Sequence, residues 1–127
     1  MTVKVKSVNR RNPRLPEEPP KFYASAQHER KIELDELATS VANRCSLRRS
    51  DVHGVLIALM DIIPVELGKG SIVNLGTLGS FFVSVRSDGA ETAEEITASM
   101  VKRLKIQYRP TKELKKQLRL IDISCAN

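Results

Sequence analysis

The sequence has few large rings: no tryptophan, three phenylalanines and two tyrosines among 127 residues. A chain this poor in aromatics gains much from sharing a core with a second copy, since large rings supply much of the apolar area in a core. No run of about 18 or more apolar residues occurs, so we expect no helix that spans a bilayer. The start, Met1 to Lys6, alternates apolar and charged residues and does not have the pattern of a signal peptide.

Cysteine and histidine are also scarce. Cys45 and Cys125 are far apart and neither has a CxxC partner, which speaks against a zinc site or a disulfide framework. His28 and His53 fit no spacing for a triad or a metal site. We therefore expect no enzyme, metal or cofactor, and a reduced cytoplasmic environment.

Charge is plentiful but uneven. The total is +6, and the sequence pI is about 9.6. Residues 1–31 hold eight bases and three acids (+5), residues 32–101 five bases and ten acids (−5), and residues 102–119 eight bases and one acid (+7). This distribution predicts a positive face, which favours a polyanion such as nucleic acid. An anionic membrane is a weaker candidate, because no basic amphipathic helix carries large apolar residues opposite its charges.

The N-terminal part reads as two strands around a stiff loop. Residues 3–8 alternate like a half-exposed strand, and residues 21–27 favour a second strand. Residues 10–20 contain four prolines and cannot form regular structure. We expect a β-hairpin with a long loop.

Two amphipathic helices follow. The apolar stripe of the first begins after Ile32 and consists of Leu34, Leu37, Ala38, Val41, Ala42 and Cys45. We expect Ser50 to cap the second helix, and Gly68 with Gly70 to end it. Pro64 removes one backbone donor, which predicts a kink or a restarted last turn.

The remainder alternates between strand and helix patterns. In chain order we predict a strand at 71–75, a glycine-bearing turn at 76–79, strands at 80–85 and 104–108 with a short helix within 86–99, a helix at 112–118 and a closing strand at 120–124. The chain is therefore α+β, with two helices in its N-terminal half under a mostly antiparallel sheet and an added N-terminal β segment. We divide it into a basic β extension with a proline-rich loop, residues 1–31, and a second domain, residues 32–124.

Two short motifs carry a family resemblance. Leu78-Gly79-Ser80-Phe81 is similar to a Phe-Gly-x-Phe turn, and Tyr108 to Leu114 (YRPTKEL) is similar to an aromatic-x-x-Gly-Lys-x-Leu junction from strand to helix. With the two preceding helices, these motifs resemble the HU/integration-host-factor family of bacterial histone-like DNA-binding proteins over residues 32–119. The basic N-terminal segment looks closer still to a divergent Bacteroidetes-type HU-like branch.

The resemblance implies an intertwined homodimer, in which helices form the base and the sheets form a saddle that holds double-stranded DNA. Leu78, Phe81 and Tyr108 stand where family aromatics fill the shared core, or they are ordinary core residues of one chain. The partners implied are double-stranded DNA and a second copy, with no membrane and no small-molecule substrate. The place implied is the cytoplasmic nucleoid.

The DNA-binding surface is expected from charge and resemblance together. A helix N-terminus with free N–H groups suits a phosphate, and clustered bases release counterions. Each base could equally be a solvated surface residue. The candidate residues are Gly79, Ser80, Lys102, Arg103, Lys105, Arg109, Thr111, Lys112, Lys115 and Lys116, with Arg10 and Arg11 from the N-terminal extension.

The sequence departs from the family at the arm. Family members carry a basic ribbon tipped by Arg-Asn-Pro, whose proline wedges between base pairs and bends the DNA. Here residues 86–103 contain three bases, four acids and no proline. Arg11-Asn12-Pro13 lies instead in the N-terminal loop, as a relocated wedge or, as we favour, by coincidence.

We therefore expect non-sequence-specific or weakly specific binding to duplex DNA, mainly through phosphate contacts. The alternative is an HU-like dimeric protein-interaction module without strong DNA binding.

Overall fold

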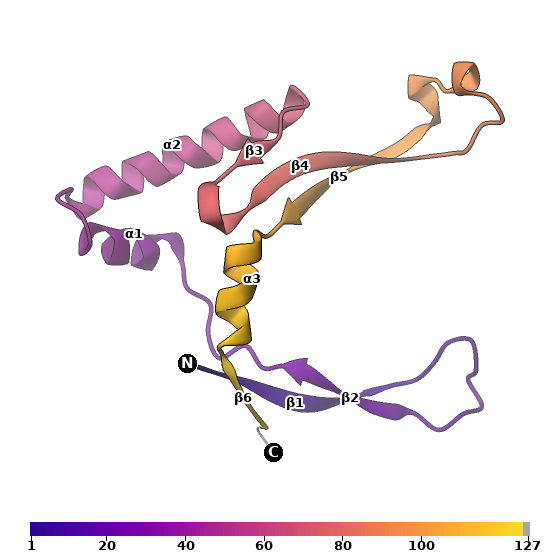
Figure 1. Ribbon diagram of the computed structural model, residues 1–127, viewed down its shortest axis with the longest axis horizontal. Helices are drawn as coiled ribbons and strands as arrows, with labels where there is room; N and C mark the ends of the chain where they lie inside the picture. The colour runs from indigo at the N-terminus through magenta and orange to yellow at the C-terminus, as the bar shows by residue number, and fades with distance from the viewer. Residues whose placement is uncertain (126–127) are drawn as a thin grey trace. The chain divides into compact units, whose positions relative to one another are not determined.

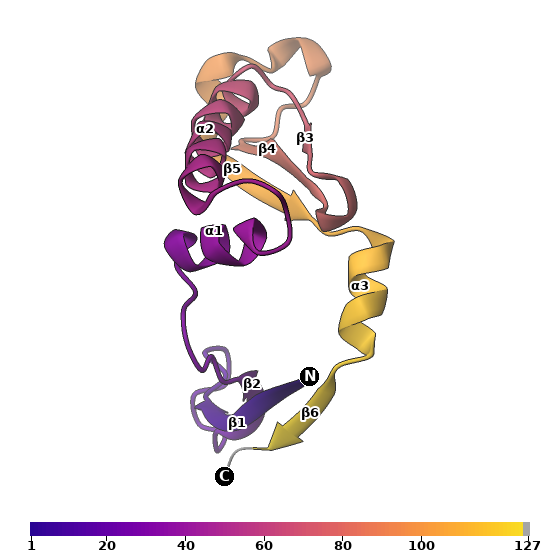
Figure 2. The same cartoon turned by 90° about the vertical axis from the view of Figure 1, so that its left-hand side faces the viewer.

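The computed structural model describes residues 1–125, which form two compact units. The strand unit comprises residues 1–33 and 117–125, and the helix–ribbon unit comprises residues 34–116. Figure 1 and Figure 2 show the elements of each unit. The predicted α+β class is confirmed, but the strands form two three-stranded sheets rather than one.

The strand unit is built on the predicted N-terminal hairpin. Strand β1 (Thr2–Arg10) pairs antiparallel with β2 (Lys21–Ala26), from Val5↔Ala26 to Arg10↔Lys21. Strand β6 (Asp122–Cys125) pairs parallel with β1 on its other edge, giving the order β2-β1-β6. Our division of the sequence put residues 120–124 with the second domain, whereas strand pairing brings β6 into the same sheet as β1. Domain boundaries at 31/32 stay a prediction.

Helices α1 (Leu34–Ala42) and α2 (Arg49–Gly68) open the helix–ribbon unit and pack against each other. The expectation that Ser50 caps α2 was wrong: Arg48 occupies the N-cap without a side-chain hydrogen bond, and Ser50 lies in the first turn. Of the two outcomes expected at Pro64, a restarted last turn was wrong, because α2 continues through it, and a kink stays a prediction. Proline costs a helix one donor but its fixed φ is helical, so a long helix can absorb it.

The rest of this unit is a β-ribbon followed by a helix, whose last three residues are counted with the strand unit. Its elements are β3 (Val73–Asn74), η1 (Gly76–Leu78), β4 (Ser80–Ser87), η2 (Ala93–Glu95), η3 (Ala98–Met100), β5 (Val101–Arg109) and α3 (Lys112–Arg119). The strand predicted at 71–75 is only two residues long, and the short helix predicted within 86–99 is two 3-10 turns. We call β4, β5 and their connection the β4–β5 ribbon; in Figure 1 it runs beside α2, with η2 and η3 at its far end.

The single chain buries little. Among residues 1–125 the buried apolar side chains are Ala38, Val52 and Leu67. Helix α2 exposes large apolar residues on several faces: Val55, Ile57, Leu59, Met60, Ile62 and Val65. A helix that is apolar all round is normally buried, and exposed apolar patches of this kind mark interaction surfaces.

Candidate nucleic-acid interface

The β4–β5 ribbon has two unlike faces. Register partners in an antiparallel pair point to the same side, and successive residues alternate sides. One side is apolar, formed by the pairs Phe81↔Tyr108, Val83↔Ile106 and Val85↔Leu104. The other side, the basic ribbon face, is formed by Ser80↔Arg109, Phe82↔Gln107, Ser84↔Lys105 and Arg86↔Arg103.

Three of the predicted bases therefore share one face: Arg103, Lys105 and Arg109. The Arg109 guanidinium lies 5.0 Å from the centre of the Phe82 ring, within cation–π range. Arg86 belongs to the same face and was missed, because we assigned residues from 86 onward to the acidic arm. Continuing the alternation of β4 by one residue would have found it.

Lys102 is placed differently from the other bases of β5. The ribbon register shifts between Arg86 and Ser87, and Lys102 lies at this irregularity. Its Nζ is 2.9 Å from Oδ1 of Asp88, so its charge is already matched by an acid of the ribbon connection. Lys102 is thus a weaker candidate for contact with a polyanion than Arg103 or Lys105.

Gly79 lies at the base of the ribbon, where two backbone segments approach closely. Its φ of 129° lies in a region that side chains rarely adopt. A Cβ at this position would lie 2.2 Å from the carbonyl oxygen of Arg109 and 3.0 Å from the Tyr108 ring. The backbone just before β4 therefore lies close against the end of β5, and Ser80 is the register partner of Arg109.

The start of α3 is tied to the same place. Thr111 Oγ1 accepts a hydrogen bond from the Leu114 amide (3.2 Å), as an N-cap side chain does, and donates to the carbonyl of Thr77 in η1. The Tyr108 hydroxyl donates to the carbonyl of Leu78 in the same turn. The structure thus gathers four predicted candidates at one junction: Gly79, Ser80, Arg109 and Thr111.

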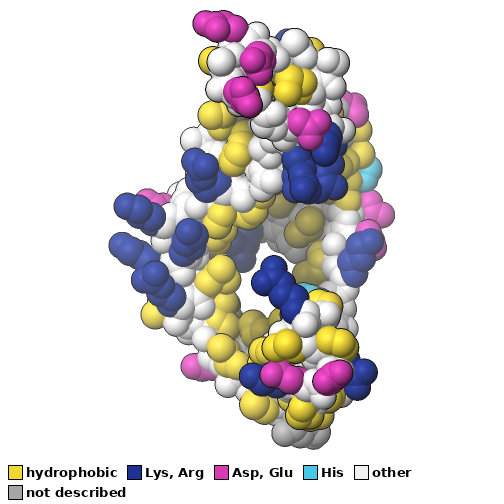
Figure 3. Space-filling model, turned by 90° about the vertical axis from the view of Figure 1, so that its right-hand side faces the viewer, with side chains coloured by type: hydrophobic (Ala, Val, Ile, Leu, Met, Phe, Trp, Pro, Cys, Tyr) yellow, Lys and Arg dark blue, Asp and Glu magenta, His cyan; other side chains and the backbone are white. Residues whose placement is uncertain are grey.

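Helix α3 presents a row of exposed cations. Residues three or four apart lie on one side of a helix. Lys112, Lys115, Lys116 and Arg119 have this spacing and are exposed, and within residues 1–125 none of them forms an ion pair. Figure 3 shows basic side chains over α3 and acidic side chains at the far end of the β4–β5 ribbon. The unpaired row leaves positive charge beside the α3 N-terminus, where the helix dipole also favours an anion.

Arg10 and Arg11 lie in the other unit. Arg10 ends β1 opposite Lys21, and Arg11 begins the proline-rich loop. They are described as a group of their own, because they belong to a different compact unit from the bases of the β4–β5 ribbon.

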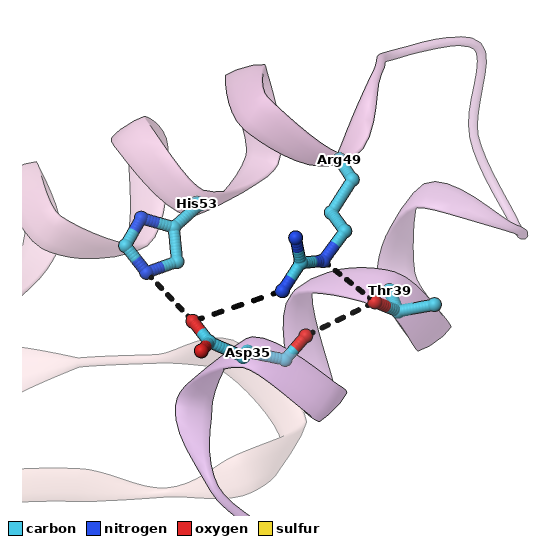
Figure 4. Close-up of polar contacts among 4 residues, drawn as sticks. All are labelled: Asp35, Thr39, Arg49 and His53. Atoms are coloured by element: carbon cyan, nitrogen blue, oxygen red, sulfur yellow. Dashed lines mark hydrogen bonds and ion pairs between the residues drawn. The ribbon is translucent and has the colours of Figure 1, made fainter.

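One polar cluster joins α1 to α2 (Figure 4). Asp35 Oδ1 lies 3.1 Å from His53 Nε2 and 3.9 Å from the Arg49 guanidinium. Arg49 Nε donates to Thr39 Oγ1 (2.9 Å), and that hydroxyl donates to the Asp35 carbonyl (3.1 Å). Sequence spacing did not reveal the pairing of His53 with a carboxylate, because it depends on how α1 and α2 pack. The cluster ties two helices and, within residues 1–125, no group of three potential ligands could hold a metal.

The fold, together with the junction between the base of the β4–β5 ribbon and the start of α3, defines a class. The class is an α+β protein with two helices, a two-faced β-ribbon and a basic helix after it. The chain belongs to the family described as "HU domain fused to wHTH, Ig, or Glycine-rich motif", which matches residues 1–124. The predicted HU-like resemblance is therefore confirmed. No curated protein matches.

A crystal structure with a similar fold comes from Bacteroides vulgatus ATCC 8482, from a bacterial protein to which DNA binding is ascribed. The TM-score is 0.65, the sequence identity is 14%, and the alignment covers 98% of this chain and 47% of that one. This chain thus spans about half the length of that protein. Within residues 1–125, no helix combines the length and apolar character of a membrane span.

Proposed function

We propose that this protein binds double-stranded DNA without marked sequence preference, mainly through phosphates, as a homodimer at the nucleoid of the cytoplasm. Membership of an HU-domain family supports DNA binding in general. The observation that carries the finer proposal is the junction where the basic ribbon face meets the start of α3.

The junction suits a phosphate. The first amides of α3 lack partners within the helix and carry the positive end of its dipole. Thr111 and Lys112 stand at that end, and Arg109 precedes it. Backbone amides and cations of this kind contact phosphate oxygens, which are the same in every sequence. Binding of low sequence specificity follows.

The dimer is supported by what the single chain leaves exposed. A groove of about 660 Å³ lies between the end of α2 and the apolar side of the β4–β5 ribbon, with Pro64, Leu67, Val83, Leu104 and Ile106 in its lining. Ile106 is 71% exposed and Leu104 69% exposed. A second copy carries the same groove and the same apolar α2, and pairing with it would bury these side chains. Each Å² of apolar surface buried in this way would stabilise the dimer by about 25 cal/mol.

The negative charge at the tip of the β4–β5 ribbon argues against bending of the DNA by this tip. Its connection carries Asp88, Glu91, Glu94 and Glu95, of which Asp88 is paired with Lys102. Phosphates would repel Glu91, Glu94 and Glu95, so we propose contacts at the base of the ribbon and on α3.

The test is the salt dependence of binding to an arbitrary duplex. Log affinity should fall against log salt with a slope of about −0.9 per phosphate contacted. The double variant Lys112→Glu, Lys115→Glu should flatten the slope by about 2, with Lys31→Glu, Lys69→Glu as a control of equal charge. No binding of the wild type at about 50 mM salt would refute the proposal.

The acidic residues of the β4–β5 connection favour a second candidate function, that of a dimeric protein-interaction module. If the α3 variant binds DNA as the wild type does but loses a protein partner, this alternative replaces the first.

A further inference from the structure

The sheet of the strand unit also has two unlike faces. By the register of β1 and β2, one face is mainly apolar: Val3, Val5, Phe22, Ala24 and Ala26, with Ser7 and Asn9 among them; Ile123 of β6 is opposite Val3. The other face, the hairpin basic face, carries Lys4, Lys6, Arg10, Lys21 and Tyr23, together with Val8 and Ser25. Lys4 is paired with Glu29 at 2.7 Å, so within residues 1–125 the unpaired cations of this face are Lys6 in mid-strand and the partners Arg10 and Lys21 at the loop end.

The loop end of this face is hollowed. A concavity of about 300 Å³ is lined by Arg10, Arg11, Asn12, Glu18, Lys21 and Tyr23, among others. Three cations thus face one carboxylate around a space large enough for a phosphate group. Within residues 1–125, the side chains of Arg10, Arg11 and Lys21 form no ion pair.

Two of these cations are held in an unfavourable position. Arg10 and Lys21 are direct register partners, so their Cβ atoms lie about 4.5–5.5 Å apart, and like charges placed directly opposite destabilise a β-pair. An anion bound between them would turn this repulsion into attraction. A feature that costs stability in the free protein is typical of a binding site.

The hollow is also formed in advance. The loop contains Pro13, Pro16, Pro19 and Pro20, each with a fixed φ. Two backbone turns close it, Leu15 N–H to the Asn12 carbonyl (3.2 Å) and Glu18 N–H to the Leu15 carbonyl (3.1 Å). The Asn12 side chain accepts a further bond from the Arg14 amide (3.0 Å). A stiff loop loses little entropy when a ligand binds.

The geometry points to a second phosphate-binding site in this hollow, which grips the backbone of duplex DNA through Arg10, Arg11 and Lys21. The inference rests on the proposed function, because it assigns a further contact to the same ligand. Arginine forks bind phosphate oxygens with two parallel hydrogen bonds, and Lys21 adds a point charge. Tyr23 also lines the hollow, and its side chain carries a hydroxyl that can donate a hydrogen bond. Pro13 then serves to stiffen the loop rather than to enter the base stack.

A pair of variants of the full chain tests the site. Arg10→Gln with Lys21→Gln should flatten the log–log salt slope of duplex binding by about 1 to 2 and should raise or preserve the melting temperature at low salt, since the like-charge pair is gone. Lys31→Gln with Lys69→Gln removes the same charge elsewhere and should leave the slope nearly unchanged. Equal slopes for the two variants overturn the inference, while a loss seen only in the α3 variant keeps the proposed function. A wild type that binds no duplex overturns both.

The acid in the hollow offers a test of opposite sign. Glu18→Gln should strengthen duplex binding, because it removes the one carboxylate in the lining, and its neighbour Glu17, which does not line the hollow, is the matched control. Equal gains from Glu18→Gln and Glu17→Gln would show only a general charge effect and would overturn the site. Titration with inorganic phosphate separates the sources: amide shifts at Arg10 and Arg11 with duplex support the inference, and shifts with phosphate but none with duplex overturn it.

Discussion

The molecule contains two β-ribbons that are built alike but differ in the charge and proline content of their tips. The β1–β2 hairpin and the β4–β5 ribbon are both antiparallel, and each has one apolar and one basic face. The hairpin loop carries four prolines, with two arginines (Arg11 and Arg14) balanced by two glutamates (Glu17 and Glu18), whereas the β4–β5 connection contains no proline and four acids. The two ribbons therefore differ most where a polyanion would first meet them.

The comparison teaches that strand pairing and ligand choice are separate properties of a ribbon. Alternation along the strands builds the two faces in both, because side chains switch sides at every residue. The tip contributes little to the pairing but decides the local potential. An acidic tip leaves binding to the ribbon base and α3, and an arginine-bearing tip adds a site at the end of the hairpin.

The largest expected effect comes from the apolar side of the β4–β5 ribbon. We expect Ile106→Glu to dissociate the proposed dimer or unfold the chain, because it removes about 1.5–3 kcal/mol of apolar burial and places a charge in the proposed interface. Gln107→Glu changes the neighbouring residue on the opposite face and should leave the dimer intact. Sedimentation of both variants checks this.

This pair distinguishes a dimer from a solitary chain. Ile106 is 71% exposed in one chain, and a surface substitution of this kind usually changes stability by less than about 0.5 kcal/mol. If Ile106→Glu and Gln107→Glu behave alike, the apolar side of this ribbon is not an interface.

The next largest effect concerns Gly79 at the base of the β4–β5 ribbon. The β1–β2 hairpin has no corresponding glycine. Gly79→Ala should lower the free energy of unfolding by about 1–3 kcal/mol, since a side chain at φ 129° is strained and would meet the Arg109 carbonyl. Gly89, in the ribbon connection, has no atom near its would-be Cβ, so Gly89→Ala should cost little. Urea unfolding measures both variants. Similar midpoints would show that the fold tolerates a side chain at position 79.

The smallest effect belongs to the hairpin. Glu29 accepts from Lys4, which lowers the pKa of the Glu29 carboxyl, and the same pair raises the pKa of Lys4. Because the folded pKa of Glu29 is the lower one, its contribution is present above the unfolded value of about 4.3 and is lost as pH falls through the folded pKa. Both groups are exposed, so the effect is slight.

Melting curves of the wild type and Glu29→Gln should accordingly differ a little at pH 7 and coincide in acid. A difference that persists at low pH would mean that the two side chains are joined by something other than charge.

Much of the local structure could be predicted from sequence. The period-2 alternation of residues 3–8 and 104–108, and the helical spacing from Leu34, gave elements that the structure confirms, because periodicity and burial are linked within a few residues. The order of elements and the two short motifs identified the HU-like family. The candidate bases were chosen from charge and from the family resemblance together, and their roles in binding stay a prediction.

Tertiary structure decided what depends on residues far apart. The pairing of β6 with β1, the meeting of His53 with Asp35 and the like-charge pair Arg10↔Lys21 arise from registers and packing that no local spacing encodes. Gly79 reads as a turn glycine in sequence, and only its close approach to the Arg109 carbonyl and the Tyr108 ring shows why a side chain is excluded there. Sequence by itself determined that two basic segments flank an acidic middle. The fold then distributed that charge between an α3 junction and a hairpin hollow, since strand register decides which cations share a face.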